Sequence, residues 1–293
     1  MKEFAIKITE TLEKEVTVSA ADKKNALEIA HEKYTVAEDD FILSADDYSG
    51  GRRMIQLYHG DSYKLIKNIP DNSVDLIVTD PPYLIESTET GCKNDLAKSI
   101  QNMNNQLAEG ILTCGINNEI LEDFVRVLKK INIYIWCNHK QIPQYLDFFV
   151  NKHECKFDIL IWNKSNATPL FNNKYLTDKE YCLYFRRGGY CNPLNYDAAK
   201  TVYYQPINAT DKKLYEHPTI KPLNIIENLI VNSSKEGEVI LDPFMGSGTT
   251  GVACRMHKRD FIGIELDKHF YEIAESRING TEIKKEFLQG ELF

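Results

Sequence analysis

Four consecutive residues, Asp80 to Tyr83, combine a carboxylate, a rigid Pro-Pro backbone and an aromatic ring. They follow the run 74–79, which is short and rich in Val and Ile and therefore predicts a buried parallel strand. Pro81 and Pro82 cannot donate ladder hydrogen bonds, so the strand should end there. A flat heterocycle could stack on Tyr83 while its amino group donates to Asp80 and to the carbonyl of Pro81. The tetrapeptide thus predicts a pocket for an exocyclic amine; the alternative is an ordinary strand exit capped by two prolines.

A second motif lies far downstream, where the apolar residues 239–241 precede a glycine-rich turn. The segment 242–250 has the sequence Asp-Pro-Phe-Met-Gly-Ser-Gly-Thr-Thr, and its glycines permit a tight turn and close backbone approach. We expect a strand, this turn and a helix over about 249–257, which together suit a nucleoside-type cofactor. A further apolar strand ends at Glu265, 19 positions after Gly246, and this spacing fits a carboxylate on ribose hydroxyls. The alternative is a purely structural β–α turn.

Together the two motifs resemble those of the DNA amino-methyltransferases, which use S-adenosylmethionine to methylate N6 of adenine or N4 of cytosine. The resemblance extends from about Met54 to the C-terminus, and the base motif precedes the cofactor motif as in the permuted β group. It implies a Rossmann-like α/β sheet, mostly parallel with one antiparallel strand. The segments 131–138, 157–164 and 180–185 resemble the next three strands of that sheet.

The resemblance also implies roles for single residues. Asp80, Pro81, Pro82 and Tyr83 should hold the target base as the catalytic set. The segment 217–222 resembles a His-Pro-Thr-x-Lys-Pro turn before the helix that closes over the cofactor. The residues expected to bind the cofactor are Asp61, His217, Thr219, Lys221, Asp242, Phe244, Gly246, Ser247, Gly248, Thr249, Thr250 and Glu265.

The expected reaction is attack of a base nitrogen on the sulfonium methyl group, driven chiefly by orientation and charge placement. The target base must leave the helix stack to reach the pocket. In the family, Asp at position 80 favours adenine and Ser favours cytosine, so we expect N6 of adenine, with N4 of cytosine as the alternative. A protein-glutamine or RNA methyltransferase is a further alternative, although the former usually has Asn at this position. From another class, a catalytically silent DNA-binding protein is disfavoured by the intact Asp80 and glycine turn.

The net charge of −8 is distributed unevenly over the 293 residues. Residues 1–50 contain six lysines and twelve acidic residues, which leaves −2 on the remaining 243 residues. The segment 186–221 holds six basic and three acidic residues interleaved with tyrosines, a composition that suits phosphate contact and base stacking. We expect residues 186–216 to form a short target-recognition region, with a solvated loop as the alternative. The expected DNA contacts are Arg186, Arg187, Lys200, Lys212 and Lys213.

Residues 1–50 are expected to form a separate ββαβ unit, joined by a Gly-Gly linker to a catalytic domain over 52–293. Alternation with period two over 4–9 and 15–18 predicts a hairpin, a helical pattern begins at Asp22, and 41–43 should form a third strand. This unit resembles the small DpnD/PcfM-like domain. Its acidity disfavours DNA contact, so we expect it to have a protein-interaction or regulatory role.

The polar stretch 84–118 is expected to be a lid or DNA-clasping loop, with an ordinary surface loop as the alternative. The seven cysteines are scattered without a Cys-x-x-Cys pair, which predicts buried thiols of a cytoplasmic protein and no metal site. We see no signal peptide and no apolar stretch long enough to span a membrane. The expected partners are DNA, a cognate restriction enzyme or another protein, and a second copy of the chain.

Overall fold

The computed structural model of the chain describes residues 2–9, 13–20, 54–84, 115–169, 173, 175–207, 209–215 and 219–280. The chain divides into two compact units, Met1–Arg53 and Met54–Phe293. In the first unit β1 (Lys2–Thr9) pairs antiparallel with β2 (Glu13–Ala20), which confirms the predicted hairpin. The helix predicted from Asp22 and the strand predicted at 41–43 lie outside the described residues.

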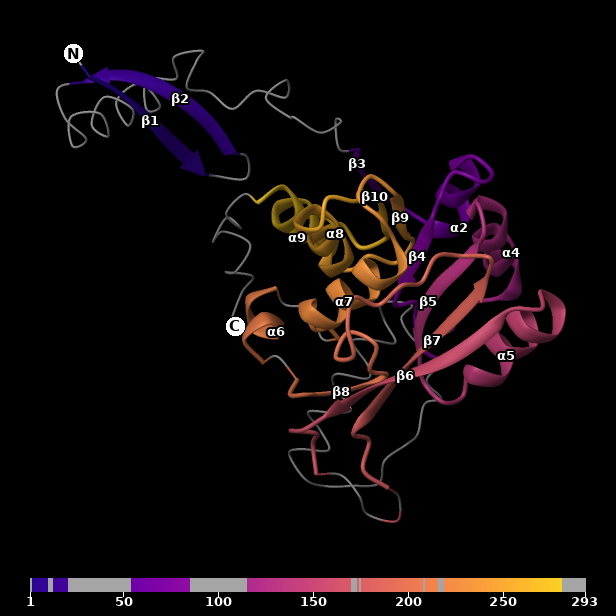
Figure 1. The fold of residues 1–293 in the computed structure, drawn as a ribbon. Helices are drawn as coiled ribbons and strands as arrows, with labels where there is room; N and C mark the ends of the chain where they lie inside the picture. Colours follow the sequence, from indigo (N-terminus) through magenta and orange to yellow (C-terminus); the bar gives the residue numbers. More distant parts are fainter. Residues whose placement is uncertain are drawn as a thin grey trace. The chain divides into compact units, whose positions relative to one another are not determined.

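The described strands β3 to β10 of the second unit form one eight-stranded sheet in the order β3-β10-β9-β4-β5-β7-β6-β8 (Figure 1). Every neighbouring pair is parallel except the two pairs made by β7, which runs antiparallel to β5 and β6. The prediction of a mostly parallel sheet with one antiparallel strand is confirmed. The strands are β3 (Ile55–His59), β4 (Leu76–Thr79), β5 (Ile131–Cys137), β6 (Lys156–Lys164), β7 (Lys179–Arg187), β8 (Val202–Gln205), β9 (Val239–Asp242) and β10 (Asp260–Glu265).

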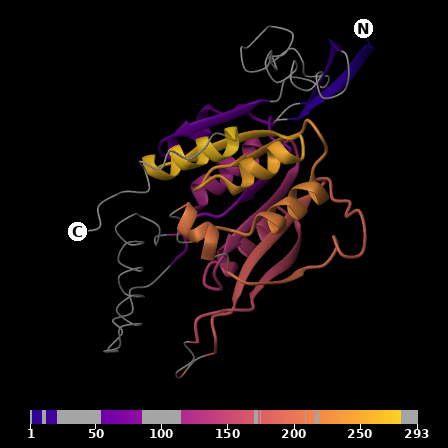
Figure 2. The ribbon, with the colours of Figure 1, turned by 90° about the vertical axis from the view of Figure 1, so that its left-hand side faces the viewer.

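Helices cover both faces of this sheet, as the two views in Figures 1 and 2 show. One face packs against the layer that contains Ile66, Phe124 and Phe149, and the other against the layer that contains Leu229 and Ala253. Because both faces are covered, the sheet has a buried apolar core on each side. The first layer comprises α2 (Ser62–Leu65), η3 (Ile66–Asn68), α4 (Asn118–Val127), α5 (Ile142–Leu146) and the π-helical turn η4 (Asp147–Lys152); the second comprises α7 (Leu223–Ser233), α8 (Thr249–Met256) and α9 (Lys268–Asn279).

The local sequence explains why these elements form. All residues of β4 and β5 are buried, which accounts for their continuous apolar character. The α4 helix starts where the Asn117 side chain accepts hydrogen bonds from two backbone N–H groups, and its buried residues share one face of the helix. The α9 helix ends at Gly280, whose φ of 71° suits a left-handed cap.

The centre of the sheet is a reversal point of the chain, where β4 and β9 are direct neighbours. From β9 the chain crosses over to β10 on one side, whereas from β4 it crosses over to β5 on the other side. Ligands of open α/β sheets bind outside the carboxyl ends of strands at such a reversal. Asp80 directly follows β4 and the glycine turn directly follows β9, so both motifs lie at this point.

In the part of the chain that the structure describes, no helix has the length and apolar character needed to cross a membrane. The described cysteines, Cys137, Cys155, Cys182, Cys191 and Cys254, are free thiols, and all but Cys191 are buried. Among the same residues, no group of three or more His, Cys, Asp and Glu side chains is placed to hold a metal ion.

We expect a chain that begins at Met54 to fold without the first unit, because both apolar layers against the sheet come from later residues. Its thermal midpoint should lie within about 5 °C of that of the full chain, since every strand of the eight-stranded sheet lies in residues 54–293. Calorimetry of the two chains would test this. An insoluble or non-cooperative shorter chain would show that residues 1–53 complete the core.

Candidate active site

Asp80 is the first member of a row of four charged side chains at the carboxyl end of β4. Its Oδ2 pairs with the ammonium group of Lys221, which also lies 3.2 Å from Oε2 of Glu180. Glu180 in turn pairs with Lys164. None of the four side chains is more than 22% exposed. Because buried charges require partners, this alternation of signs is what permits the row to exist away from water.

The antiparallel direction of β7 brings the row together. Lys164 is the last residue of β6, and Glu180 is the second residue of β7, opposite Trp162. A strand that runs antiparallel to its neighbours starts where they end, so Glu180 lies at the same edge of the sheet as Asp80. Lys221 reaches this edge from the turn that precedes α7.

Burial and ion pairing act in opposite directions on the pKa values of the row. Burial raises the pKa of Asp80, and this effect outweighs the attraction of Lys221. Burial would also raise the pKa of Glu180, but Lys221 and Lys164 together lower it to about 2. Burial would lower the pKa of Lys221, but Asp80 and Glu180 raise it above its ordinary value. Glu180 and Lys221 therefore stay charged at neutral pH.

Two aromatic rings flank the row. The Lys221 Nζ lies 5.4 Å from the ring centroid of Tyr83 and 5.4 Å from that of Trp136. The Tyr83 hydroxyl donates to Oε2 of Glu180 over 3.4 Å. The other oxygen of Asp80, Oδ1, is buried and has no hydrogen-bond partner among the described residues. An incoming planar amine could donate a hydrogen bond to this oxygen while its ring stacks on Tyr83.

A buried carboxylate, Asp242, joins the two sequence motifs. It accepts hydrogen bonds from Oγ1 of Thr79 at 2.9 Å, from Oγ1 of Thr250 at 2.7 Å and from the backbone N–H of Phe244 at 3.1 Å. Thr79 is the last residue of β4, directly before Asp80. Asp242 is 3% exposed, and burial raises its pKa to about 7. Both Asp242 oxygens accept hydrogen bonds from protein donors, so this side chain and Thr250 hold the turn in place.

The glycine turn is shaped by backbone conformation and by Glu265. Gly246 and Gly248 have φ values of 51° and 81°, and a Cβ on Gly248 would lie 2.9 Å from that of Ala274. Oε2 of Glu265 accepts a hydrogen bond from the Gly246 N–H at 2.8 Å, and burial raises the pKa of this carboxyl. Ser247 is buried, and both its carbonyl and its hydroxyl accept hydrogen bonds from Arg277.

The structure brings most of the predicted site residues to one edge. The backbone N–H of Gly60 donates to the carbonyl of Glu265, so Asp61 lies at the end of β3 beside β10. Phe244 and Thr249 lie at the same edge because they are part of the glycine turn after β9. Thr219 lies two residues before Lys221 and is exposed. His217 lies outside the described residues, as does nearly all of the predicted lid over 84–118.

Three of the five predicted DNA contacts do not lie at this edge. Arg186 and Arg187 pair with Asn132 and Ile131 at the amino end of β5, because β7 runs antiparallel. Lys200 precedes β8, whose first residue pairs with the middle of β6. Arg186 and Arg187 are therefore separated from Asp80 by the length of the strands, and Lys200 lies beside the middle of β6, away from its carboxyl end.

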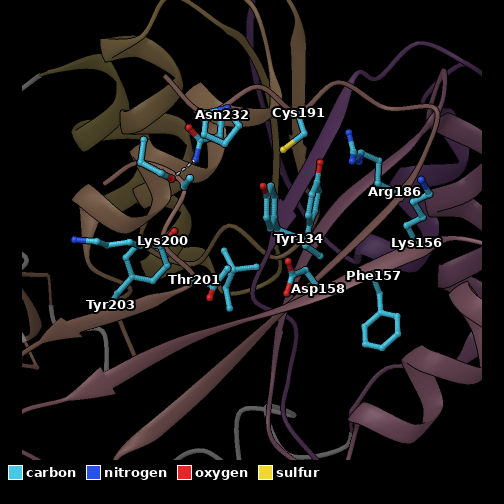
Figure 3. A pocket seen from close by; sticks show the side chains of 15 residues that line it. Tyr134, Lys156, Phe157, Asp158, Arg186, Cys191, Lys200, Thr201, Tyr203 and Asn232 are labelled. Atoms are coloured by element: carbon cyan, nitrogen blue, oxygen red, sulfur yellow. Dashed lines mark hydrogen bonds between the residues drawn. The ribbon is translucent and has the colours of Figure 1, made fainter. Parts of the chain in front are cut away.

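A cavity of about 330 Å³ marks that opposite edge (Figure 3). Lys156 and Arg186, which face each other across β6 and β7, lie on one side of it, and Lys200 lies on the other. The stacked rings of Tyr134 and Tyr184, with centroids 4.1 Å apart, line it between them. This cavity is distinct from the row of charges around Asp80.

The other two predicted DNA contacts lie on α6 (Ala209–Leu214), which follows the carboxyl end of β8. Burial lowers the pKa of Lys212, and the ammonium groups of Lys164 and Lys221 lower it further, so Lys212 lies beside the charged row. Lys213 is exposed. The active-site edge thus has two further basic residues, a half-buried Lys212 and an exposed Lys213.

Three residues of the site were not singled out by the sequence: Lys164, Glu180 and Trp136. Each stands at or near the end of a predicted strand, where a polar or large side chain reaches the sheet edge. The signal that could have identified Glu180 is the predicted antiparallel strand, since its first residues must meet the carboxyl ends of its neighbours.

Comparison with known proteins gives two family matches. The family described as DNA methylase matches residues 74–276, and the family described as DpnD/PcfM-like protein matches residues 4–50. The Type II methyltransferase M2.MboI of Moraxella bovis is 29% identical over 80% of this chain and 91% of that protein. The Type II methyltransferase M2.LlaDCHI of Lactococcus lactis subsp. cremoris is 31% identical over 76% of this chain and 88% of that protein.

Two solved structures are similar to this chain. The complex of M1.HpyAVI with SAM has a TM-score of 0.51 and 28% identity, covering 76% of this chain and 100% of that one. The PvuII DNA methyltransferase, described as cytosine-N4-specific, has a TM-score of 0.59 over 81% of this chain and 95% of that one. At 15% identity, it shares the fold.

Replacing Asp242 by Asn should flatten the pH dependence of stability between about pH 4 and pH 7. In this window the carboxyl is ionised in the unfolded chain but protonated in the folded protein, so the folded state binds more protons and stability decreases as pH rises. The linked free energy is about 4 kcal/mol. Urea unfolding of both proteins across this range, with the exposed Asp71→Asn as a control, would measure it. Equal slopes in all three proteins would contradict the assignment.

Proposed function

Because the chain belongs to the DNA methylase family, we propose that it transfers a methyl group from S-adenosylmethionine to the exocyclic N6 of adenine in DNA. The observation that supports this most directly is the buried Oδ1 of Asp80, which has no hydrogen-bond partner among the described residues and lies near the Tyr83 side chain, where β4 and β9 end together. The alternative target with the same architecture is N4 of cytosine.

The residues around the glycine turn fit this cofactor. Gly246 and Gly248 leave the backbone open to close approach, and a side chain at Gly248 would collide with α9. Each oxygen of Glu265 accepts one backbone N–H, from Gly246 or from Asp267, and each keeps a second lone pair for a ribose hydroxyl. Asp61 is half-exposed at the neighbouring strand end and can accept from the adenine amine.

The cofactor supplies an electrophilic methyl group on a sulfonium centre. The two N–H groups of the target amine donate hydrogen bonds to Asp80 and to the Pro81 carbonyl, and this orients the nitrogen lone pair towards the methyl group. Tyr83 stacks on the base and replaces part of the stacking lost when the base leaves the helix. After transfer the nitrogen carries a positive charge and readily loses a proton, which Oδ1 of Asp80 can hold before it reaches solvent. Orientation and charge placement supply most of the acceleration.

DNA should approach over α6 rather than over the opposite edge of the sheet. Lys212 and Lys213 follow the carboxyl end of β8, whereas Arg186 and Arg187 lie at the other end of the strands and Lys200 lies beside the middle of β6. Phosphates next to a flipped base must lie within reach of the catalytic pocket, which favours the two lysines.

We further propose that the acidic DpnD/PcfM-like unit binds a protein partner rather than DNA, and that a restriction enzyme of the same specificity accompanies the methyltransferase in the cytoplasm. Residues 1–50 match a family separate from the DNA methylases and carry a net charge of −6. Both observations support a separate role for this unit. A homodimer is part of the same proposal.

The reaction is tested by incubating the protein with tritiated S-adenosylmethionine and DNA, RNA or protein, followed by digestion and identification of the labelled species. N6-methyladenine from DNA is the expected product. Labelled N4-methylcytosine would select the alternative target, labelled RNA or protein would move the enzyme to another substrate class, and cofactor binding without transfer would indicate a silent scaffold.

Asp80→Ala should reduce single-turnover methylation at least about a hundredfold, because the amine loses its acceptor, while cofactor affinity should change less than about threefold. Gly246→Val and Glu265→Ala should do the reverse and weaken cofactor binding first. Calorimetry and single-turnover rates would separate the two effects. Loss of cofactor affinity in Asp80→Ala would show that this residue belongs to the cofactor site.

Replacing Lys212 and Lys213 together by Ala should lower the magnitude of the slope of log K against log salt by up to about 1.8, since each phosphate contact contributes about 0.9. The matched control replaces Arg186, Arg187 and Lys200, and we expect its slope to equal that of the wild type. DNA binding measured at several salt concentrations gives both slopes. A reduced slope only in the control would place the DNA at the opposite edge of the sheet.

A further inference from the structure

Lys221 lies where the proposed reaction needs room for the target base and an Asp80 carboxylate that is not paired with a cation. Its ammonium group pairs with Oδ2 of Asp80 and lies 5.4 Å from the ring centroid of Tyr83. The proposed function puts the target amine on that carboxylate and the target base on that ring. In the structure the Lys221 ammonium group therefore lies next to the position proposed for the target base.

This pairing stabilises the pocket without a base but opposes the reaction. A buried carboxylate such as Asp80 is costly without a counter-ion, and Lys221 provides it. During methyl transfer, however, positive charge develops on the attacking nitrogen. An ammonium group bound to the same carboxylate weakens Asp80 as an acceptor and repels that charge. Lys221 must consequently move away from Asp80 for transfer to be fast.

Glu180 is the second acceptor that such a movement requires. Its Oε2 already lies 3.2 Å from the Lys221 Nζ, so the ammonium group can exchange one carboxylate for the other by a small side-chain rotation. Lys164 pairs with Glu180 from the other side, and this cation helps to keep the Glu180 carboxylate ionised. A buried lysine is thereby never left without a partner.

We propose that Glu180 is a positioning residue for methyl transfer, which receives the Lys221 ammonium group from Asp80 when the target amine enters the pocket. This inference rests on the proposed function. Glu180 does not touch the reacting atoms; it acts by holding Lys221 so that Asp80 is fully available to the amine.

The test compares Glu180→Gln in two backgrounds, with Lys221 present and with Lys221→Met. With Lys221 present, the loss of the second carboxylate should leave the ammonium group on Asp80 and reduce the single-turnover rate at least about tenfold. In the Lys221→Met background no ammonium group competes for Asp80, so the same Glu180→Gln change should cost less than about threefold. Glu180→Asp, which keeps the charge, should recover part of the loss.

Thermal midpoints check that the variants fold, and calorimetry checks that they bind S-adenosylmethionine. The Kd of each variant for S-adenosylmethionine should differ less than about threefold from that of the wild type. The control is Glu122→Gln, a carboxylate that pairs with Lys152 on the outer surface of α4 and should leave the rate unchanged.

A direct reading of base entry is the fluorescence of 2-aminopurine placed at the target adenine of a DNA sequence that the wild type methylates. Its rise on binding should be smaller for Glu180→Gln than for the wild type, because Lys221 then stays at the base position. Equal losses of rate in both backgrounds, or a wild-type rate in Glu180→Gln, would overturn the inference. A wild-type protein that methylates no DNA would instead overturn the proposed function itself.

Discussion

The Asp242 carboxylate fixes the distance between the two halves of the site. One of its oxygens accepts from Thr79 at the end of β4, and the other accepts from Thr250 at the start of α8. The same carboxylate accepts the Phe244 N–H, so the turn after β9 and the strand before Asp80 share one anchor. Such hydrogen bonds are short-ranged and directional, and a shift of either strand would break them. In the proposed reaction the two bound groups must approach each other nearly in line, and this anchor holds the elements that are proposed to position both.

Around that anchor, the direction of each strand decides which side chains meet. The parallel strands β3, β10, β9 and β4 all end at the same edge, which gathers Asp61, Glu265, the glycine turn and Asp80. The antiparallel β7 contributes its beginning instead of its end. This reversal places Glu180 inside the site and sends the basic residues at the end of the same strand to the far edge. One strand therefore serves two separate surfaces of the protein.

The sequence predicted the strands that are buried on both faces, because continuous apolar runs such as those of β4, β5 and β9 have no other stable place in an α/β protein. It predicted the glycine turn because only glycine adopts the φ of Gly248 without strain. It missed β8, whose residues alternate between exposed and half-buried and thus resemble a polar loop. It also placed Arg186 and Arg187 with Lys212, since composition records that basic residues are near in sequence but not which edge of the sheet they reach.

The permuted order of the motifs has a consequence for how the protein folds. The hydrogen bond between Thr79 and Asp242 joins residues 163 positions apart, and the β4–β9 pairing closes a loop of the same size at the centre of the sheet. Closing so long a loop carries an entropic cost that local contacts do not, and contacts of this range slow folding. The hairpin of β6 and β7 and the β9–α8–β10 crossover have much shorter loops to close. The Thr79–Asp242 contact at the centre of the site therefore belongs, together with the pairing of β3 and β10, to the long-range contacts of the domain that are expected to form slowly.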